Sequence, residues 1–114
     1  MDPSNQDKDV TVFGTVLGYR KDNYKSTPED IVQWIAIECH VGTIKFDQEF
    51  NRNKQWKKLN LIGGDKIEFG AKLRTTIFYK DIHSGRESEY SEFYEFDTIE
   101  YFSLLHVKMI HIIN

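Results

Sequence analysis

The histidines and the single cysteine are the residues most able to bind a metal or to act as nucleophiles. His106 and His111 lie five positions apart, which would place their rings on opposite faces of a strand. Cys39 is the only cysteine, which excludes an internal disulfide and a cysteine-cluster zinc site. No local motif marks Cys39 or Ser84 as a nucleophile. We therefore predict a protein that is not an enzyme and that uses no metal and no cofactor.

The carboxylates between Glu87 and Glu95 suggest an alternative. They could hold a magnesium ion and so support a small hydrolase or nuclease. Runs of acids in loops are more often simply solvated, and Gly63–Lys66 lacks the spacing and the Ser or Thr of a phosphate-binding loop. No catalytic constellation can be named from these residues.

Charge is unevenly distributed along the chain, although the formal net charge is only −3. The segment from Lys45 to Arg74 carries eight bases and four acids, a local charge of +4. The segment from Asp81 to Glu100 carries seven acids and one base, a local charge of −6. Because salt screens each charge beyond roughly 8–10 Å, the basic segment can attract a polyanion on its own. Either segment could also be a solvated face, and the acidic one could mimic a nucleic-acid backbone, shield the basic one or dock a basic protein.

The elements that must position these residues are predicted to be strands. Val10–Tyr19 is rich in β-branched and aromatic residues, and Gly14 and Gly18 lie where a strand could coil or bulge. One face of this strand would carry Val10, Val12 and Val16, and the other Thr11, Phe13, Thr15 and Tyr19. A loop over Arg20–Asp30 would follow.

Two more strands are predicted after that loop, over Ile31–Cys39 and Thr43–Phe46. In the first, Ile35, Ile37 and Cys39 would point inward and Trp34, Ala36 and Glu38 outward; a register shifted by one would instead bury Trp34. In the second, Ile44 and Phe46 would share a face. Asn51–Leu61 predicts a short helix, in which Trp56 would be the apolar anchor among solvated lysines.

The clearest alternation predicts a half-buried strand over Lys66–Arg74, with Ile67, Phe69, Ala71 and Leu73 on its inner face. Thr75–Asp97 holds six aromatic residues around a turn signal and would form a β-hairpin or a long ordered loop. Thr98–Ile113 would be the last strand, with Leu105, Val107 and Met109 on one face.

This order predicts an all-β fold: a five-stranded, OB-fold-like Greek-key barrel. One short helix would lie between strands 3 and 4, and a long aromatic and acidic hairpin or loop between strands 4 and 5. The segment Leu61–Leu73 resembles the fourth-strand motif of small OB-fold proteins encoded near replication genes on phages and other mobile elements. The resemblance implies a single-stranded-nucleic-acid-binding accessory protein. In that group the loop after the motif tends to be glycine-rich and basic, whereas here it is acidic and aromatic.

The first hypothesis for function is therefore non-enzymatic binding of single-stranded DNA, with RNA as the alternative, in the DNA replication of a mobile element or phage. Such binding needs positive charge for phosphates and aromatic faces for bases. In an OB-fold the exposed face of the second and third strands, with the loops beside it, is the usual site. The candidate nucleic-acid-binding residues are Phe13, Tyr19, Arg20, Lys21, Tyr24, Trp34, Lys45, Lys72, Arg74, Phe78, Tyr79 and Lys80.

The second hypothesis is a protein-interaction subunit that docks on a polymerase, primase or helicase through the acidic and aromatic segment 81–100. The candidate partner-binding residues are Tyr90, Phe93, Tyr94 and Phe96. The aromatic residues from Phe78 to Phe96 could equally pack a hairpin. The long apolar final strand could pair with another chain at its edge, so the oligomeric state stays open.

Length and composition favour one packed domain. The 114 residues leave little room for two domains, and 39% hydrophobic with 14% aromatic residues supports a core. The longest apolar runs are only a few residues, so no membrane span is expected. Met1–Asp7 is polar and acidic, the reverse of a secretory signal. We expect residues 1–9 to be a frayed tail and residues 10–114 to form the domain, in a reduced, cytoplasmic setting.

Overall fold

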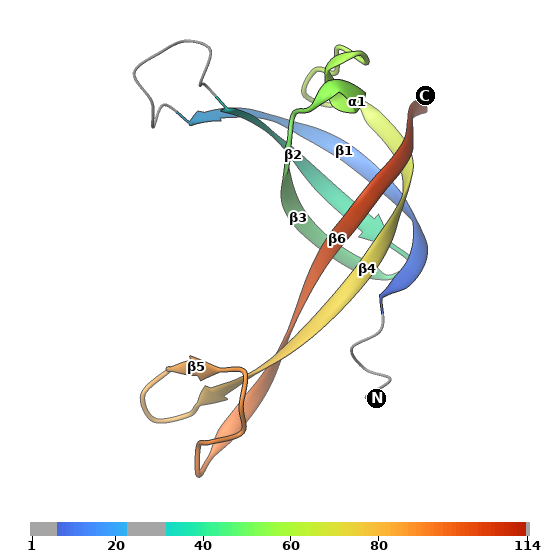
Figure 1. Cartoon of the computed structure of the whole chain (residues 1–114). Coiled ribbons are helices and arrows are strands. Elements are labelled where there is room, and N and C mark those ends of the chain that lie inside the picture. Colours follow the sequence, from blue (N-terminus) through green and yellow to red (C-terminus); the bar gives the residue numbers. More distant parts are fainter. Residues whose placement is uncertain (1–6, 23–31, 114) are drawn as a thin grey trace.

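The computed structural model describes residues 7–22 and 32–113, and in that part of the chain it shows an all-β protein with one short helix (Figure 1). The elements are β1 (Lys8–Asp22), β2 (Val32–Val41), β3 (Ile44–Asn51), α1 (Lys54–Lys57), β4 (Lys66–Asp81), β5 (Glu87–Ser88) and β6 (Phe96–Ile113). The all-β class and the short helix after the third strand are confirmed. β1 begins before the predicted start at Val10, because Lys8 and Asp9 pair with Leu73 and Lys72 of β4.

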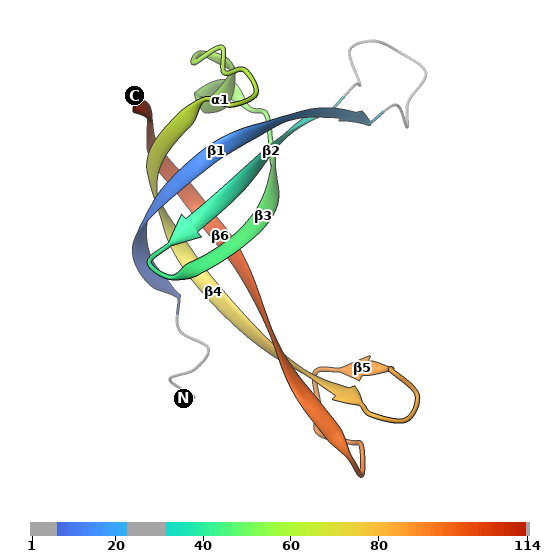
Figure 2. The ribbon, with the colours of Figure 1, turned by 180° about the vertical axis from the view of Figure 1, so that it is seen from behind.

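The strands form one antiparallel sheet in which β1 lies between β2 and β4. β3 pairs with the far edge of β2, and β6 pairs with β4 from one end to the other. The sheet curls so strongly that β6 lies beside β3 (Figures 1 and 2). No strand ladder joins β3 to β6 within the described residues, so the sheet is open at this seam.

A side chain bridges the seam between β3 and β6. Nε2 of Gln48 donates to the carbonyl oxygen of Leu104 at 3.0 Å, and the N–H of Leu104 donates to Oε1 of Gln48 at 2.8 Å. Along the same seam the ring of Phe46 stacks on that of Phe102, with centroids 5.8 Å apart. These contacts hold β6 against β3 without backbone pairing.

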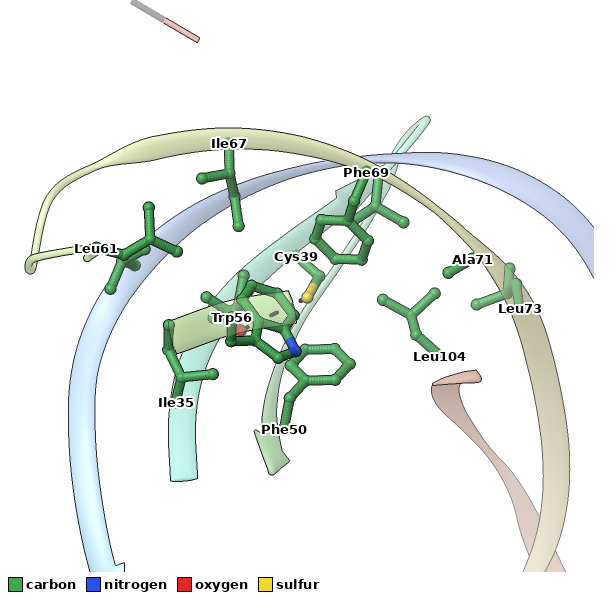
Figure 3. Close-up of a cluster of buried hydrophobic side chains, with 13 residues drawn as sticks. Ile35, Cys39, Phe50, Trp56, Leu61, Ile67, Phe69, Ala71, Leu73 and Leu104 are labelled. Atoms are coloured by element: carbon green, nitrogen blue, oxygen red, sulfur yellow. Dashed lines mark hydrogen bonds between the residues drawn. The ribbon is translucent and has the colours of Figure 1, made fainter. Parts of the chain in front are cut away.

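The core fills the inside of the curled sheet and is closed at one end by α1 (Figure 3). Trp56 of this helix is 1% exposed, and its ring lies 5.3 Å from that of Phe50 and 5.8 Å from that of Phe69. Asn53 caps the helix by accepting a hydrogen bond from the N–H of Gln55 at 3.2 Å. The inward residues predicted for the second and fourth strands are confirmed, as is the anchoring role of Trp56, and Val10, Val12 and Val16 of β1 share the face on the core as predicted. The buried core consists of Val12, Val16, Ile35, Ile37, Cys39, Phe50, Trp56, Leu61, Ile67, Phe69, Ala71, Leu73 and Leu104.

The face predicted for the last strand is wrong, because β6 contains two bulges opposite β4. The register shifts between Glu68 and Gly70 and again between Gly70 and Lys72, so β6 holds one extra residue at each place. The inward residues are therefore three apart: Leu104 is buried, and Val107 and Ile110 pack against the core. Of the predicted set Leu105, Val107 and Met109, only Val107 packs there, and Met109 is 79% exposed.

A bulge also changes the face of Tyr19. The pairing of β1 with β2 shifts between Val16 and Gly18, and beyond it Tyr19 lies opposite the inward-facing Ile35. Tyr19 therefore does not share a face with Phe13, as the simple alternation predicts. Its hydroxyl turns back over the end of the core and donates to the carbonyl oxygen of Leu61 at 2.6 Å.

Beyond the core, β4 and β6 continue together as a two-stranded arm (Figures 1 and 2). We define the arm as residues 74–103, with its tip at residues 82–95 and β5 pairing with β4 near that tip. The arm shows that the segment after the fourth strand forms a hairpin rather than a loop. It makes the molecule elongated, with a radius of gyration of 17.1 Å, where a compact chain of this length would have about 13 Å.

Candidate nucleic-acid interface

Trp34 and Arg20 lie together where β1, β2 and β3 approach their common end. The three strands place Arg20 opposite Trp34, and Trp34 opposite Asn51. Trp34 lies on the outer face and is half-buried, so the outward register is confirmed. The guanidinium carbon of Arg20 is 5.7 Å from the centre of the Trp34 ring, and Nη2 of Arg20 is 2.7 Å from a carboxylate oxygen of Glu49. This arrangement puts a cation on an indole ring at the surface.

A second guanidinium lies against a second ring at the same end. The guanidinium carbon of Arg52 is 4.6 Å from the centre of the Tyr19 ring. Nη1 of Arg52 donates to Oε1 of Gln33 at 2.7 Å, and the backbone N–H of Arg52 donates to the carbonyl oxygen of Gln33 at 2.9 Å. Nε of Arg52 is buried and has no hydrogen-bond partner among the described residues. The position of Arg52 just after the third strand, beside a run of lysines, is the only sequence signal that could have identified it.

We call this region the basic end and define it by Tyr19, Arg20, Lys21, Trp34 and Arg52. The residues after Arg52 lead directly into α1, whose Lys54 and Lys57 are exposed, as is Lys58 at its C-cap. Figure 1 shows α1 at the same end of the sheet as the close of β1 and the start of β2. The basic end therefore combines two ring–guanidinium pairs with further cations. Tyr24, which the sequence also nominates, lies outside the described residues.

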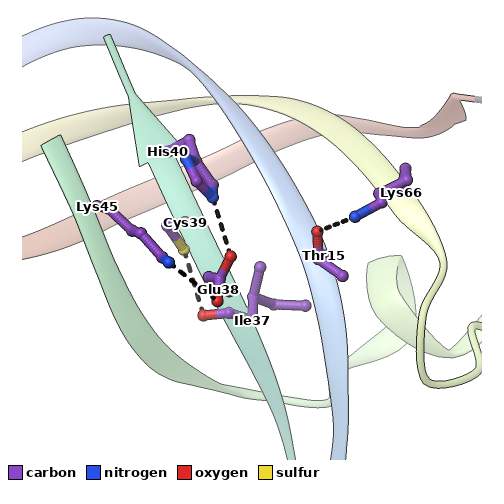
Figure 4. Close-up of polar contacts among 7 residues, drawn as sticks. All are labelled: Thr15, Ile37, Glu38, Cys39, His40, Lys45 and Lys66. Carbon is purple, nitrogen blue, oxygen red and sulfur yellow. Dashed lines mark hydrogen bonds and ion pairs between the residues drawn. The ribbon is translucent and has the colours of Figure 1, made fainter. Parts of the chain in front are cut away.

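Phe13 and Lys45 lie on the same outer face, but farther along the sheet. Lys45 pairs with His40 in register, six residues along β3 from Asn51, a separation of about 20 Å in an extended strand. Nζ of Lys45 is 3.8 Å from one oxygen of Glu38, whose other oxygen is 3.0 Å from Nε2 of His40 (Figure 4). The hydrogen bond from His40, and then the charge of Lys45, lower the pKa of Glu38. Phe13 is 49% exposed and lies opposite His40.

Lys72 and Arg74 form ion pairs with Asp9 and Asp7, respectively. Nζ of Lys72 is 3.1 Å from Oδ1 of Asp9. Nε and Nη2 of Arg74 each donate to one carboxylate oxygen of Asp7 at 3.0 Å. The hydrogen bond from Arg74 lowers the pKa of Asp7. These two cations already have carboxylate partners, unlike a free phosphate-binding stripe.

Phe78, Tyr79 and Lys80 lie on the arm and are not brought together with Trp34. The ring of Phe78 packs edge-on against Tyr101, with centroids 5.2 Å apart. The ring of Tyr79 packs in the same way on Phe96 at 5.0 Å. Lys80 is paired in register with Asp97 and Glu87. Two of these three residues therefore pack the hairpin, and the third is opposite acids.

The candidate partner-binding residues divide into two pairs. Tyr94 is 99% exposed and Tyr90 is 74% exposed, both at the tip of the arm. Phe93 is half-buried, with the guanidinium carbon of Arg86 5.2 Å from the centre of its ring, and Phe96 packs on Tyr79. Of these four residues, only Tyr90 and Tyr94 have rings that are largely exposed on the described part of the chain.

The buried thiol of Cys39 lies in the core, away from these surfaces. Burial raises its pKa to about 12, so at neutral pH it is a protonated, apolar side chain. Within residues 7–22 and 32–113, no three His, Cys, Asp or Glu side chains are grouped so that they could hold a metal ion. In the same ranges no helix has the length and apolar character to cross a membrane.

Comparison with known proteins gave no match: no family model, no curated protein and no solved structure is detectably similar to this chain.

Proposed function

We propose that the protein binds single-stranded nucleic acid, DNA in the first place, as a non-enzymatic replication accessory of a phage or mobile element. One observation carries this proposal: at the basic end, Arg20 lies against Trp34 and Arg52 against Tyr19. Aromatic rings stack on bases of any sequence, and guanidinium groups bind phosphates. The two pairs lie at the same end of the sheet, Arg20 with Trp34 on the outer face and Arg52 with Tyr19 on the inner side, with the cations of α1 nearby. This arrangement suits a short stretch of unpaired strand that passes over the end of the sheet.

The strand order supports an OB-fold-like assignment, which we include in the proposal. β1 lies between β2 and β4, β6 pairs with β4 and contacts β3, and α1 lies between β3 and β4. A closed OB-fold barrel has this neighbour order, and it binds oligonucleotides on the face of its second and third strands. The basic end lies at the edge of that face, where β1 ends.

The basic end is not the part of the surface that carries Lys45, Lys72 and Arg74, the cations that the basic segment of the sequence nominates. Lys45, Lys72 and Arg74 have carboxylate neighbours on the folded chain. Arg20 also has one, Glu49, and because an exposed ion pair contributes only about 0–1 kcal/mol, a phosphate can compete for each of these cations. Arg20 differs in lying against the indole ring of Trp34, which supplies stacking of roughly 1–3 kcal/mol for a base. Binding should be weakly sequence-selective and strongly weakened by salt.

Titration with a fluorescent oligo-dT at low and moderate salt tests the proposal. Trp34→Ala should weaken binding by about 5- to 150-fold, in line with the loss of one stacked base, and Arg20→Ala should reduce the salt dependence. Lys45→Ala removes a cation of the same sheet face well away from the basic end and is the matched control; it should change affinity little. Failure to bind at micromolar protein in low salt would contradict the proposal. Oligo-U in parallel separates DNA from RNA preference.

A second candidate function is docking on a replication enzyme such as a polymerase, primase or helicase. It is favoured by the exposed rings of Tyr90 and Tyr94 at the tip of an arm that extends beyond the core. Replacing residues 82–95 by a short turn should abolish co-purification with the enzyme and leave oligo-dT binding intact. Trp34→Ala should weaken oligo-dT binding and leave co-purification with the enzyme intact. If the protein with the shortened arm still co-purifies with the enzyme, docking through the arm is contradicted.

A further inference from the structure

The outer edge of β6 in the arm has no neighbouring strand among the described residues. β6 pairs with β4 on one side over its whole length, while β5 pairs with the opposite edge of β4. Near the core, Gln48 satisfies the backbone N–H and carbonyl of Leu104 on this edge. Farther along the arm the edge is open to solvent. Unpaired backbone groups of this kind are a template for an added strand.

The bonds to Gln48 fix which residues of β6 face outward. Leu104 uses its N–H and carbonyl toward β3, so it forms no backbone bonds to Leu73, its register partner on β4. In an antiparallel pair such residues alternate with those bonded to the partner strand. The regular register from Leu104 outward therefore points the N–H and carbonyl of Phe102, Glu100 and Thr98 away from β4. No described residue accepts or donates a bond at these groups.

The charge around this edge determines what could pair with it. The segment 81–100 has a local charge of −6, and Glu100 is an exposed residue of the open edge with no ion-pair partner among the described residues. A second copy of the chain would bring an equally acidic arm alongside, and like charges on neighbouring strands are destabilising. A strand that carries Lys or Arg would instead place its charges beside Glu100.

We propose that the edge of β6 from Thr98 to Phe102 binds an extended, basic segment of a partner protein as an additional β-strand. This inference rests on the second candidate function, docking through the arm, and specifies its chemistry. Main-chain hydrogen bonds to the three outward residues provide the attachment, and the acids of the arm select a positively charged segment. The tip rings Tyr90 and Tyr94 then supply secondary contacts.

Amide hydrogen exchange by NMR gives a signature that only strand addition produces. The probe is a synthetic peptide of about nine residues that alternates Lys with Val or Thr, a pattern that favours strands. Binding should slow exchange at Thr98, Glu100 and Phe102. Ile99 and Tyr101 already donate toward β4 and should change little. The matched control is the same peptide with Glu in place of Lys, which should give no protection.

Three substitutions at one position separate backbone pairing from charge. Glu100→Gln removes the charge and keeps the outward N–H, whereas Glu100→Pro removes both without removing a bond to β4, because proline is tolerated on strand edges. Glu100→Pro should weaken binding of the basic peptide by about tenfold or more beyond the effect of Glu100→Gln. Glu100→Lys keeps the N–H. It should weaken binding of the basic peptide and allow the acidic peptide to bind. Unchanged oligo-dT binding and unfolding temperature confirm that each variant is folded.

The outcomes distinguish this inference from the docking function on which it rests. If the basic peptide shifts the resonances of Tyr90 and Tyr94 but does not protect the three outward amides, strand addition is wrong and docking by the tip stands. If no basic peptide affects the arm and the shortened arm still co-purifies with the enzyme, both are wrong. Protection that rises with protein concentration, without peptide, would mean that a second copy occupies the edge and would overturn the basic partner.

Discussion

Gln48 satisfies both backbone groups of Leu104, acting at one point of the seam in place of a neighbouring strand. Gln48→Leu would leave the N–H and the carbonyl of a buried residue without partners. We expect it to lower the free energy of unfolding by about 1–3 kcal/mol, measured by urea denaturation. Glu89→Leu, at an exposed residue of the tip of the arm, should change it by less than about 0.5 kcal/mol. Equal decreases in the free energy of unfolding for the two variants would show that the hydrogen bonds between Gln48 and Leu104 do not stabilise the fold.

Trp56 is the centre of the aromatic part of the core, between Phe50 and Phe69. Trp56→Ala should lower the free energy of unfolding by about 3–5 kcal/mol, since it removes a fully buried ring and leaves a cavity. Phe13→Ala, at a ring that is 49% exposed, should cost less than about 1 kcal/mol. The Trp56 variant retains Trp34 as its only tryptophan, so acrylamide quenching should report a solvent-accessible fluorophore. Strong resistance to quenching would contradict the outward position of Trp34.

Gly14 permits the close approach of β1 to two core side chains. A Cβ at this position would lie 2.7 Å from Cγ2 of Ile37 and 3.2 Å from Cγ1 of Ile67. Gly14→Ala should therefore destabilise the protein by about 1–3 kcal/mol through overpacking. At Gly63 a Cβ would come no closer than 3.6 Å to the carbonyl oxygen of Leu17, so Gly63→Ala should be tolerated. Thermal unfolding followed by circular dichroism compares the two, and the prediction is wrong if Gly14→Ala melts no lower than Gly63→Ala.

The pairing of Asp7 with Arg74 makes stability depend on pH in the acid range. The pKa of Asp7 is lowered from its usual 3.8 by the hydrogen bond from Arg74, and that of Glu38 from 4.5 by His40. A carboxyl whose pKa is lower in the folded state adds stability that is complete above its unfolded pKa. That stability is lost as the pH falls through the folded pKa. We expect the free energy of unfolding to decrease below about pH 5.

Asp7→Asn tests this origin of the pH dependence. Urea denaturation at several pH values should give a shallower decrease for the variant than for the natural chain. Glu89→Gln, at an exposed residue with no ion-pair partner among the described residues, should leave the slope unchanged. The same slope in all three proteins would show that Asp7 is not linked to folding.

The sequence predicted β4 and the first half of β1 well because their alternation is uninterrupted by bulges. Ile67, Phe69, Ala71 and Leu73 face inward as the period of two requires. In β6 the extra residues occur where His106 and Met109 adopt positive φ angles of 54° and 56°. Neither residue is a glycine, so no local signal marks the bulges, and of the predicted face Leu105, Val107 and Met109 only Val107 packs against the core.

The candidate site was predicted only in part, because its residues are brought together by register between distant segments. Trp34 and Arg20 were nominated from residue type, and their adjacency follows from the pairing of β1 with β2. Gly18 signalled a bulge, but which way Tyr19 would turn depends on that pairing. The bond between Arg74 and Asp7 spans 67 positions, so the sequence alone could not reveal that this cation is already paired.

The arm is continuous with the core strands, because β4 and β6 run without a break from one into the other. Its eight residues of β4 from Arg74 to Asp81 span about 26 Å. No hinge separates the two parts, and the natural twist of a two-stranded ribbon gives the tip a set rotation relative to the body. A partner bound at the tip of the arm would therefore be held at a defined distance and orientation from a ligand bound at the basic end.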